Sequence, residues 1–224
     1  MKKRLFQASW FSILWLLYCA VLIIMNPEIL AGVTAVSVIA GCVFLGGTGL
    51  AILVISERKE MKIVQLFIFF LILLLLDQAA KTAVFYQLPA DKTIPLIDDW
   101  LGISYTPNHH NNVIFNLLNI NLSSRIADVL IKTISIVIAF GIGIYFFISY
   151  RIFFTSTVSR ISIALIAAGA VCSLIDTIRF GFVLDFIYLY PLVAFDFKDL
   201  YLQYGVVLAF ITFWNMPKEI KDEN

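Results

Sequence analysis

Five aspartates hold positions from which they could support chemistry, because they stand at or near the ends of long apolar runs. Ionisable groups at membrane depth are costly, so each of them is a functional candidate. Two end apolar runs and three lie in the segment before the last run: Asp77, Asp176, Asp185, Asp196 and Asp199, with Lys81 four residues after the first. If the runs cross a membrane in alternating directions, all five meet near one membrane face.

Two carboxylates held close together cannot both ionise easily, so they share a proton and titrate as a unit. Such a pair can act as base and acid around a water molecule, as it does in aspartic proteases. The sequence has no Ser/His or Cys/His constellation near these aspartates. Aspartyl hydrolysis is therefore one hypothesis, and ion translocation and structural ion pairing are the alternatives at this point. Asp77 and Lys81, at i,i+4 spacing on a helix, are a candidate ion pair.

Neither a metal nor a cofactor is expected. His109 and His110 are adjacent and lack metal-ligand spacing, so they are interpreted as surface-loop residues. The three cysteines lie in apolar runs without a CxxC pair, which is typical of small buried side chains: Cys19, Cys42 and Cys172.

The composition indicates a membrane protein. The 224 residues are 61% hydrophobic and only 14% charged, whereas a soluble domain carries about 25% charged residues. The mean hydropathy is +0.95, which also excludes a disordered chain. A net charge of +1 offers no basic face for nucleic acid.

The apolar runs predict about six transmembrane helices, since one crossing needs about 20 apolar residues. Four glycines in the second run suggest close packing of its helix: Gly41, Gly46, Gly47 and Gly49. The polar segment 81–126 predicts a small β-rich element at the membrane surface. The predicted fold is thus an all-α polytopic membrane protein with a β-rich extracytoplasmic cradle, whose spans are roughly 9–25, 30–55, 63–80, 127–149, 158–178 and 202–216.

Lysine and arginine placement predicts the orientation. Six crossings bring the basic residues before span one, between spans two and three, between spans four and five and after span six to one side. That side is predicted to be cytoplasmic and to hold both termini. Segments 81–126 and 179–201, with the aspartates beside them, then lie on the extracytoplasmic side, where Asp185 and Asp199 are expected to lie in a loop.

Four motifs in order resemble one family. Residues 77–81 form D-Q-x-x-K, and 169–176 (GAVCSLID) look like G-A-x-G-N-L-I-D. Residues 181–186 match G-x-V-x-D-F, and 195–199 (FDFKD) are similar to F-N-x-A-D. Their order and spacing resemble signal peptidase II, the lipoprotein signal peptidase, over about residues 62–216.

The resemblance implies a four-span aspartyl endopeptidase of the bacterial cytoplasmic membrane, active at the extracytoplasmic face. Its substrate would be a prolipoprotein cut just before the diacylglyceryl-modified cysteine, and no metal would be needed. Asp185 and Asp199 would be the catalytic dyad. The residues implied to support the site or bind substrate are Asp77, Lys81, Asn108, Ser173, Asp176 and Asp196.

Several positions depart from the family pattern. Cys172 and Ser173 replace Gly and Asn, Thr177 replaces an Arg, and Asp196 replaces an Asn. The family's N-x-G-A-A-F segment is replaced over residues 109–115. A lost Arg and a gained Asp predict a more negative site, which would raise the pKa values of the dyad and shift the working pH upward. Arg179, two residues after Thr177, is expected to compensate in part, and its i,i+3 spacing from Asp176 also suggests an ion pair between the two.

Three domains are predicted: an extra N-terminal hairpin over 1–58, a four-span core over 59–216 and a cytoplasmic tail over 217–224. The partners expected are the lipid-modified prolipoprotein and membrane lipid. The alternatives are a non-proteolytic relative that binds lipidated peptides or a membrane partner and, from another class, an ion-coupled transporter. A transporter predicts carboxylates at the span centres, but here they cluster at one edge.

Overall fold

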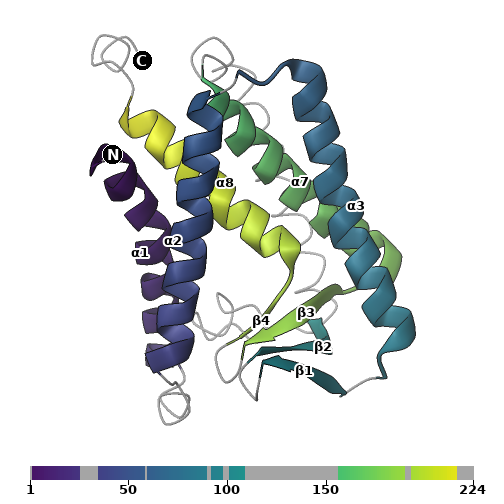
Figure 1. The fold of residues 1–224 in the computed structure, drawn as a ribbon. Helices are drawn as coiled ribbons and strands as arrows, with labels where there is room; N and C mark the ends of the chain where they lie inside the picture. The colour runs from purple at the N-terminus through teal and green to yellow at the C-terminus, as the bar shows by residue number, and fades with distance from the viewer. Residues whose placement is uncertain are drawn as a thin grey trace.

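A computed structural model describes residues 2–25, 35–58, 60–89, 92–97, 101–108, 156–189 and 193–215. Long helices stand side by side and a small sheet lies across one end of them (Figure 1). The helices are α1 (Lys2–Met25), α2 (Ala35–Arg58), α3 (Ile63–Gln87), α7 (Thr157–Phe180) and α8 (Phe197–Trp214). The strands are β1 (Thr93–Ile97), β2 (Leu101–Asn108), β3 (Val183–Leu189) and β4 (Val193–Phe195).

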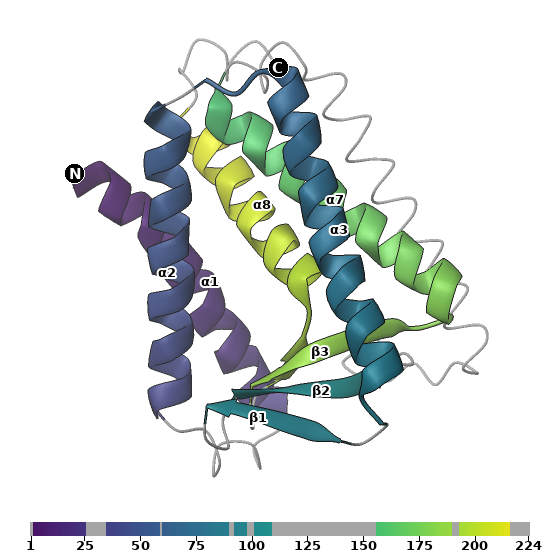
Figure 2. The same cartoon turned by 45° about the vertical axis from the view of Figure 1, so that its right-hand side comes forward.

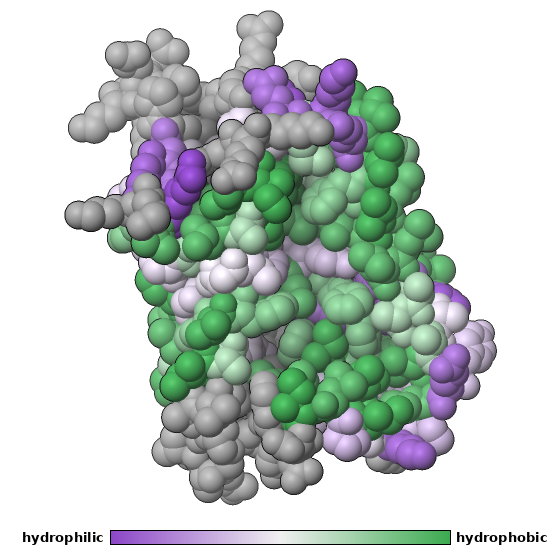
Figure 3. Space-filling view, viewed as in Figure 1, coloured by the Kyte–Doolittle hydropathy of each residue, from purple (hydrophilic) through white to green (hydrophobic). Residues whose placement is uncertain are grey.

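Four described helices are long and apolar enough to cross a membrane: α1 over Lys3–Val21, α2 over Val38–Ser56, α3 and α7. In lipid a helix satisfies its own backbone polar groups, and these segments have no internal proline that would break it. Apolar side chains dominate the middle of the face seen in Figure 3, and hydrophilic ones gather toward its two ends. The predicted polytopic membrane fold is confirmed.

The six predicted spans fare differently. Spans 9–25, 30–55, 63–80 and 158–178 correspond to α1, α2, α3 and α7. Span 127–149 lies outside the described residues. Span 202–216 corresponds to α8, which is not among the helices apolar enough to cross, since its first turn carries Lys198 and Asp199. Six crossings therefore stay a prediction.

The predicted β-rich element is confirmed, but its extent differs. All four strands form one antiparallel sheet in the order β1-β2-β3-β4. Only β1 and β2 come from segment 81–126. Strand β3, from segment 179–201, forms hydrogen bonds with β2 and extends the sheet beyond that segment. That register pairs Thr106 with Asp185 and Asn108 with Val183. Figure 2 shows the sheet beside the last turns of α3 and the start of α8.

Helices α7 and α8 approach closely at two glycines, which fixes where α8 begins relative to α7. A Cβ atom on Gly205 would lie 3.1 Å from the backbone nitrogen of Ile166, and one on Gly169 would lie 3.2 Å from the carbonyl oxygen of Lys198. The Ser162 hydroxyl also donates to the Gly205 carbonyl oxygen at 2.7 Å. The first turn of α8 is thereby held against α7.

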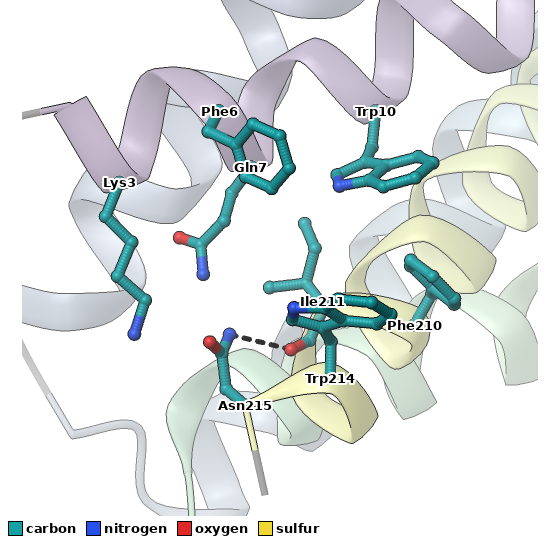
Figure 4. A pocket seen from close by; sticks show the side chains of 8 residues that line it. All are labelled: Lys3, Phe6, Gln7, Trp10, Phe210, Ile211, Trp214 and Asn215. Carbon is teal, nitrogen blue, oxygen red and sulfur yellow. Dashed lines mark hydrogen bonds between the residues drawn. The ribbon is translucent and has the colours of Figure 1, made fainter.

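The N-terminal hairpin packs through glycines, as predicted, with one exception. Cβ atoms on Gly41, Gly46 and Gly49 would lie 2.3 to 2.6 Å from α1 side chains, whereas one on Gly47 would meet nothing within 4 Å. Gly47 is the exception because it faces away from α1. The start of α1 also lies beside the end of α8, where the two helices border a hollow of about 180 Å³ (Figure 4).

Candidate active site

A buried lysine joins three aspartates from different parts of the chain. The Lys81 ammonium lies 2.8 Å from Asp77 on α3, 2.5 Å from Asp176 on α7 and 2.6 Å from Asp196 before α8. All four side chains are fully buried. Because buried charges persist only when they are paired, this cluster fixes how the three helices meet.

Lys81 reaches this cluster because α3 is longer than expected. The sequence predicts a span that ends at residue 80, whereas the helix continues to Gln87. Asp77 and Lys81 therefore lie one turn apart on the same helix face. The predicted pairing of these two residues is confirmed, and two further carboxylates join it.

Asp196 links two lysines and caps a helix. Its Oδ2 atom lies 2.6 Å from Lys81 Nζ and 2.5 Å from Lys198 Nζ. Its Oδ1 atom accepts a hydrogen bond from the backbone N–H of Asp199 at 3.1 Å, and the Asp199 carboxylate accepts one from the backbone N–H of Asp196 at 3.3 Å. This reciprocal cap begins α8 and orients Asp199.

A second group of carboxylates surrounds Lys198. Carboxylate oxygens of Asp185, Asp196 and Asp199 lie within 4.8 Å of one another. Lys198 Nζ is 3.8 Å from Asp185 Oδ1 and 3.6 Å from Asp199 Oδ1. Asp185 is nearly buried, whereas 45% of the Asp199 side-chain surface is exposed. Asp185 and Asp199 therefore form a close carboxylate pair with one more accessible member.

Local structure places these two aspartates firmly. The sequence interpretation set both in a loop, and this is wrong: Asp185 lies in β3 and Asp199 in the first turn of α8. The Gly181 residue that ends α7 has φ +74°, a left-handed conformation suited to glycine, and it turns the chain into β3. The site thus rests on a strand and a capped helix.

Polar neighbours support the buried cluster. Gln78 donates from Nε2 to Asp176 at 2.9 Å and to Asp77 at 3.2 Å. The backbone N–H of Lys198 donates to Asp77 Oδ1 at 3.3 Å, so the start of α8 is tied to α3. Arg179 donates to Thr82 Oγ1 at 2.8 Å instead of forming the suggested ion pair with Asp176, which is already bound by Lys81.

Electrostatics at the pair agree in part with the sequence prediction. Partial burial raises the pKa of Asp199 above its ordinary value; the Lys198 charge opposes this rise and the Asp196 charge adds to it. The pKa of Lys198 is also raised: burial lowers it, but the carboxylates of Asp199, Asp196 and Asp185 outweigh that effect. The predicted direction therefore holds for Asp199, although burial is its first cause.

The structure brings together six of the eight predicted site residues: Asp77, Lys81, Asp176, Asp185, Asp196 and Asp199. Among the described residues, Ser173 makes no hydrogen bond to this cluster, although it lies on α7 near Asp176. The backbone of Asn108 ends β2, but its side chain lies outside the described part of the structure. Residues 109–115, with His109 and His110, lie outside it as well.

Lys198 is the residue that the sequence interpretation missed. Its signal was present, because the motif F-N-x-A-D has alanine where this chain has lysine. The change is paired with the Asn-to-Asp departure at Asp196, two residues earlier, and the two side chains form the 2.5 Å ion pair. A lysine introduced beside an added carboxylate could have been recognised as a compensating charge.

Two carboxylate triads have the oxygen ligands that a hard cation prefers: Asp77, Asp176 and Asp196, and Asp185, Asp196 and Asp199. In each triad a lysine ammonium already lies within 4 Å of every member. Positive charge is therefore supplied by the chain itself. A carboxylate pair with buried cations beside it suits acid–base chemistry on a water molecule.

The fold and site define a class: polytopic membrane proteins with a carboxylate pair where the helices meet a sheet. Two solved structures, each described as a bacterial membrane enzyme, share the fold. One has a TM-score of 0.57 at 22% identity and covers 71% of this chain and 99% of its own. The other has a TM-score of 0.56 at 23% identity and covers 74% and 95%.

Sequence comparisons identify the family. Residues 69–215 match the family described as signal peptidase (SPase) II. A lipoprotein signal peptidase of Fusobacterium nucleatum is 32% identical over 156 residues, covering 68% of this chain and 88% of that protein. One of Halothermothrix orenii is 29% identical over 154 residues, covering 69% and 98%. The chain belongs to the signal peptidase II family and is a membrane protease.

Proposed function

We propose that this chain is an aspartyl endopeptidase that removes signal peptides from prolipoproteins. The cut falls just before the lipid-modified cysteine, and Asp185 and Asp199 are the catalytic dyad. The observation that carries the proposal is the close approach of their carboxylates beside Asp196, within 4.8 Å. Family membership supports the peptidase activity, and the relatives named lipoprotein signal peptidase support the substrate.

The pair can perform both proton transfers of hydrolysis. One aspartate, ionised, takes a proton from water as its oxygen attacks the scissile carbonyl carbon. The other, protonated, gives its proton to the carbonyl oxygen. When the tetrahedral intermediate collapses, the C–N bond breaks, the leaving nitrogen receives a proton from the first aspartate, and one hydroxyl of the intermediate returns its proton to the second, so the starting protonation of the pair is restored. Asp199, the more exposed member, is the one that water and substrate reach first.

The remaining predicted residues hold the pair or contact the substrate. Asp77, Lys81 and Asp176 fix the ends of α3 and α7, and Asp196 caps the helix that carries Asp199. Asn108 and Ser173 would contact polar groups of the substrate. The four-stranded sheet would cover the bound peptide, while its lipid stays between the helices.

Orientation and domains follow the charge pattern. We place both termini in the cytoplasm and the carboxylate site at the extracytoplasmic face of a bacterial cytoplasmic membrane. Residues 1–58 would form an additional hairpin, residues 59–216 the peptidase core and residues 217–224 a cytoplasmic tail. The family profile begins at residue 69, beyond the hairpin, which supports this division.

Cleavage of a defined substrate tests the proposal. Purified protein in detergent receives a diacylglyceryl-modified prolipoprotein, and a gel shift reports the product. Asp185→Asn and Asp199→Asn are each expected to abolish cleavage, whereas Glu60→Gln, at an exposed acidic residue outside the site, is expected to leave it unchanged. Cleavage that survives both aspartate substitutions would refute the dyad assignment.

A second candidate function is binding of lipidated peptides without cleavage. The observation that favours it is the Lys198 ammonium within 4 Å of both dyad carboxylates, since a cation there can keep both ionised and leave no proton to donate. Wild-type protein that binds the modified prolipoprotein but leaves it intact at every pH would establish this function instead.

A further inference from the structure

An ion pair beside the dyad distinguishes this site from a simple pair of aspartates. Asp196 and Lys198 lie 2.5 Å apart, and the buried lysine also lies between the two dyad aspartates. Its distances to Asp185 and Asp199, 3.8 and 3.6 Å, are too long for strong hydrogen bonds but short enough for strong charge interaction. The lysine therefore acts on both aspartates without donating strongly to either.

The charge around the pair depends on Lys198. The five clustered aspartates carry five formal negative charges when ionised, and Lys81 and Lys198 supply two positive ones. Lys81 is surrounded by its own three carboxylates, so among the described residues Lys198 is the cation that lies within 4 Å of both Asp185 and Asp199. Removing it would strengthen the repulsion between these two close carboxylates and the third beside them.

We propose that Lys198 is a positioning residue that sets the protonation of the Asp185–Asp199 pair, and that Asp196 holds Lys198 in place for this purpose. The inference rests on the proposed function of the pair. An opposite charge within about 4–6 Å favours the ionised carboxylate, so Lys198 keeps the base form available at lower pH. Asp196, fully buried and shared with Lys81, anchors the lysine within the rigid cluster.

The other titratable groups around the pair are the same in wild type and in the variants, so their effects cancel when the pH profiles are compared. They come from four elements and comprise Tyr18 on α1, Asp77 and Lys81 on α3, Cys172 and Asp176 on α7 and Tyr201 on α8. Only Lys198 places a positive charge within 4 Å of both dyad carboxylates among the described residues. Replacing it alone therefore isolates its effect.

The test is the pH profile of kcat/KM in wild type and four variants. Lys198→Met removes the charge and keeps the length, and both limbs of the profile are expected to move upward by about one pH unit or more. Lys198→Arg should restore the position of the limbs. The double variant Asp196→Asn/Lys198→Ala removes both partners and should recover most of the shift. Lys92→Met, at an exposed lysine, is the matched control.

A second readout does not need activity. Carbon-13 NMR of aspartate carboxyls in detergent follows titration of the pair, with Asp185→Asn and Asp199→Asn used for assignment. Wild type that cleaves, combined with limbs and carboxyl titrations unmoved in Lys198→Met, would overturn the inference and leave the proposed function standing. Wild type without cleavage would refute the proposed function, and the NMR comparison would still decide what Lys198 does.

A different feature, the hollow between α1 and α8, supports a second inference. Gln7 is 92% buried as a whole residue and lines the hollow, and its carboxamide, which is open to the hollow, makes no hydrogen bond to a described residue. Figure 4 shows it aimed into the hollow between Lys3 and Asn215, with Trp10 and Trp214 as walls. Among the described residues, no carboxylate lies within ion-pair distance of Lys3. The Lys3 ammonium and the Gln7 carboxamide thus line one hollow beside aromatic rings, and neither has a polar partner among the described residues.

The geometry points to the phosphate of an anionic phospholipid as the occupant. The hollow lies at the end of the bundle opposite the sheet, where aromatic rings of the kind found at membrane interfaces meet the basic start of α1 (Figure 1). Lys3 and Gln7 would donate to the phosphate oxygens. The acyl chains would lie along the exposed apolar surface of α1, and the anionic headgroup would match the basic rim.

Native mass spectrometry of the full chain, titrated with phosphatidylglycerol or phosphatidylcholine, tests this site. Phosphatidylglycerol should bind at least about five times more tightly, and Lys3→Ala and Gln7→Leu should each remove most of that preference. Lys62→Ala, at an exposed lysine before α3, is the control. Equal binding of both lipids, variants without effect, or displacement by inorganic phosphate alone would overturn the inference.

Discussion

The ammonium nitrogen of Lys81 lies 2.5 Å from Oδ2 of Asp176, a residue 95 positions later in the sequence. This contact joins α3 to α7 inside a fully buried cluster. Helices in lipid gain little from apolar contacts with one another, so polar contacts of this kind carry much of the specificity of their association. The ion pair therefore sets the frame in which the strand with Asp185 and the helix with Asp199 are placed.

Replacing Lys81 by methionine should destabilise the protein strongly. The substitution keeps most of the side-chain volume but takes the Lys81 cation from buried Asp77 and Asp176, while Asp196 keeps its contact with Lys198, and breaking a buried pair costs about 3–5 kcal/mol. The midpoint of unfolding in a detergent titration measures the loss. Lys62→Met, at an exposed lysine near the other end of α3, is the control and should change the midpoint little. Equal midpoints for both variants would contradict the structural importance of the cluster.

Asp196 combines capping and charge, and two substitutions separate these contributions. Asp196→Asn keeps an oxygen that can accept the Asp199 N–H and should retain the cap, whereas Asp196→Ala loses it. The alanine variant should be less stable than the asparagine variant by about 0.5–2 kcal/mol. Circular dichroism during thermal unfolding gives the comparison. Two variants of equal stability would mean that the cap contributes nothing measurable to α8.

Gly205→Ala should loosen the crossing of α7 and α8. The added Cβ would lie 3.1 Å from backbone atoms of Ile166 and Ser162, which cannot move aside as a flexible side chain can. Overpacking of this kind costs about 1–3 kcal/mol. Gly47→Ala adds a Cβ into open space and should be neutral or slightly stabilising, because alanine favours helix. Thermal unfolding of both variants in one detergent tests the difference.

Long apolar runs and ordered motifs let the sequence predict most of the fold and the membership of the site. The run 63–76 could only be a helix, and the motif residues Asp77, Lys81 and Asp176 were expected near one another. The end of α3 was harder to predict. The helix continues past the apolar run, and this places Lys81 beside three carboxylates. Local hydropathy contains no information about such a long-range pairing.

Strand pairing and the position of Lys198 were also beyond local patterns. The β2–β3 register joins segments about 80 residues apart in the sequence, and it moves Asp185 from an expected loop into a strand. Lys198 lies in a motif whose aspartates were the candidate site residues, and it was not itself a candidate. The cap at Asp196 begins α8 in a position that places Lys198 beside the pair, and the motif alone does not show this.

The raised pKa of Asp199 leads to a stability prediction with a definite sign. A carboxyl whose pKa is higher in the folded than in the unfolded protein makes the folded state less stable as pH rises between the two values. Asp199→Asn removes this penalty and should raise the Tm at pH 8, by no more than about 2–4 °C because the side chain is partly exposed. The gain should shrink as the pH falls and more of the wild-type carboxyl becomes protonated. Glu60→Gln should give no such pH-dependent gain, and a lower Tm for Asp199→Asn at pH 8 would mean that the ion pair with Lys198 outweighs the cost of burying the carboxylate.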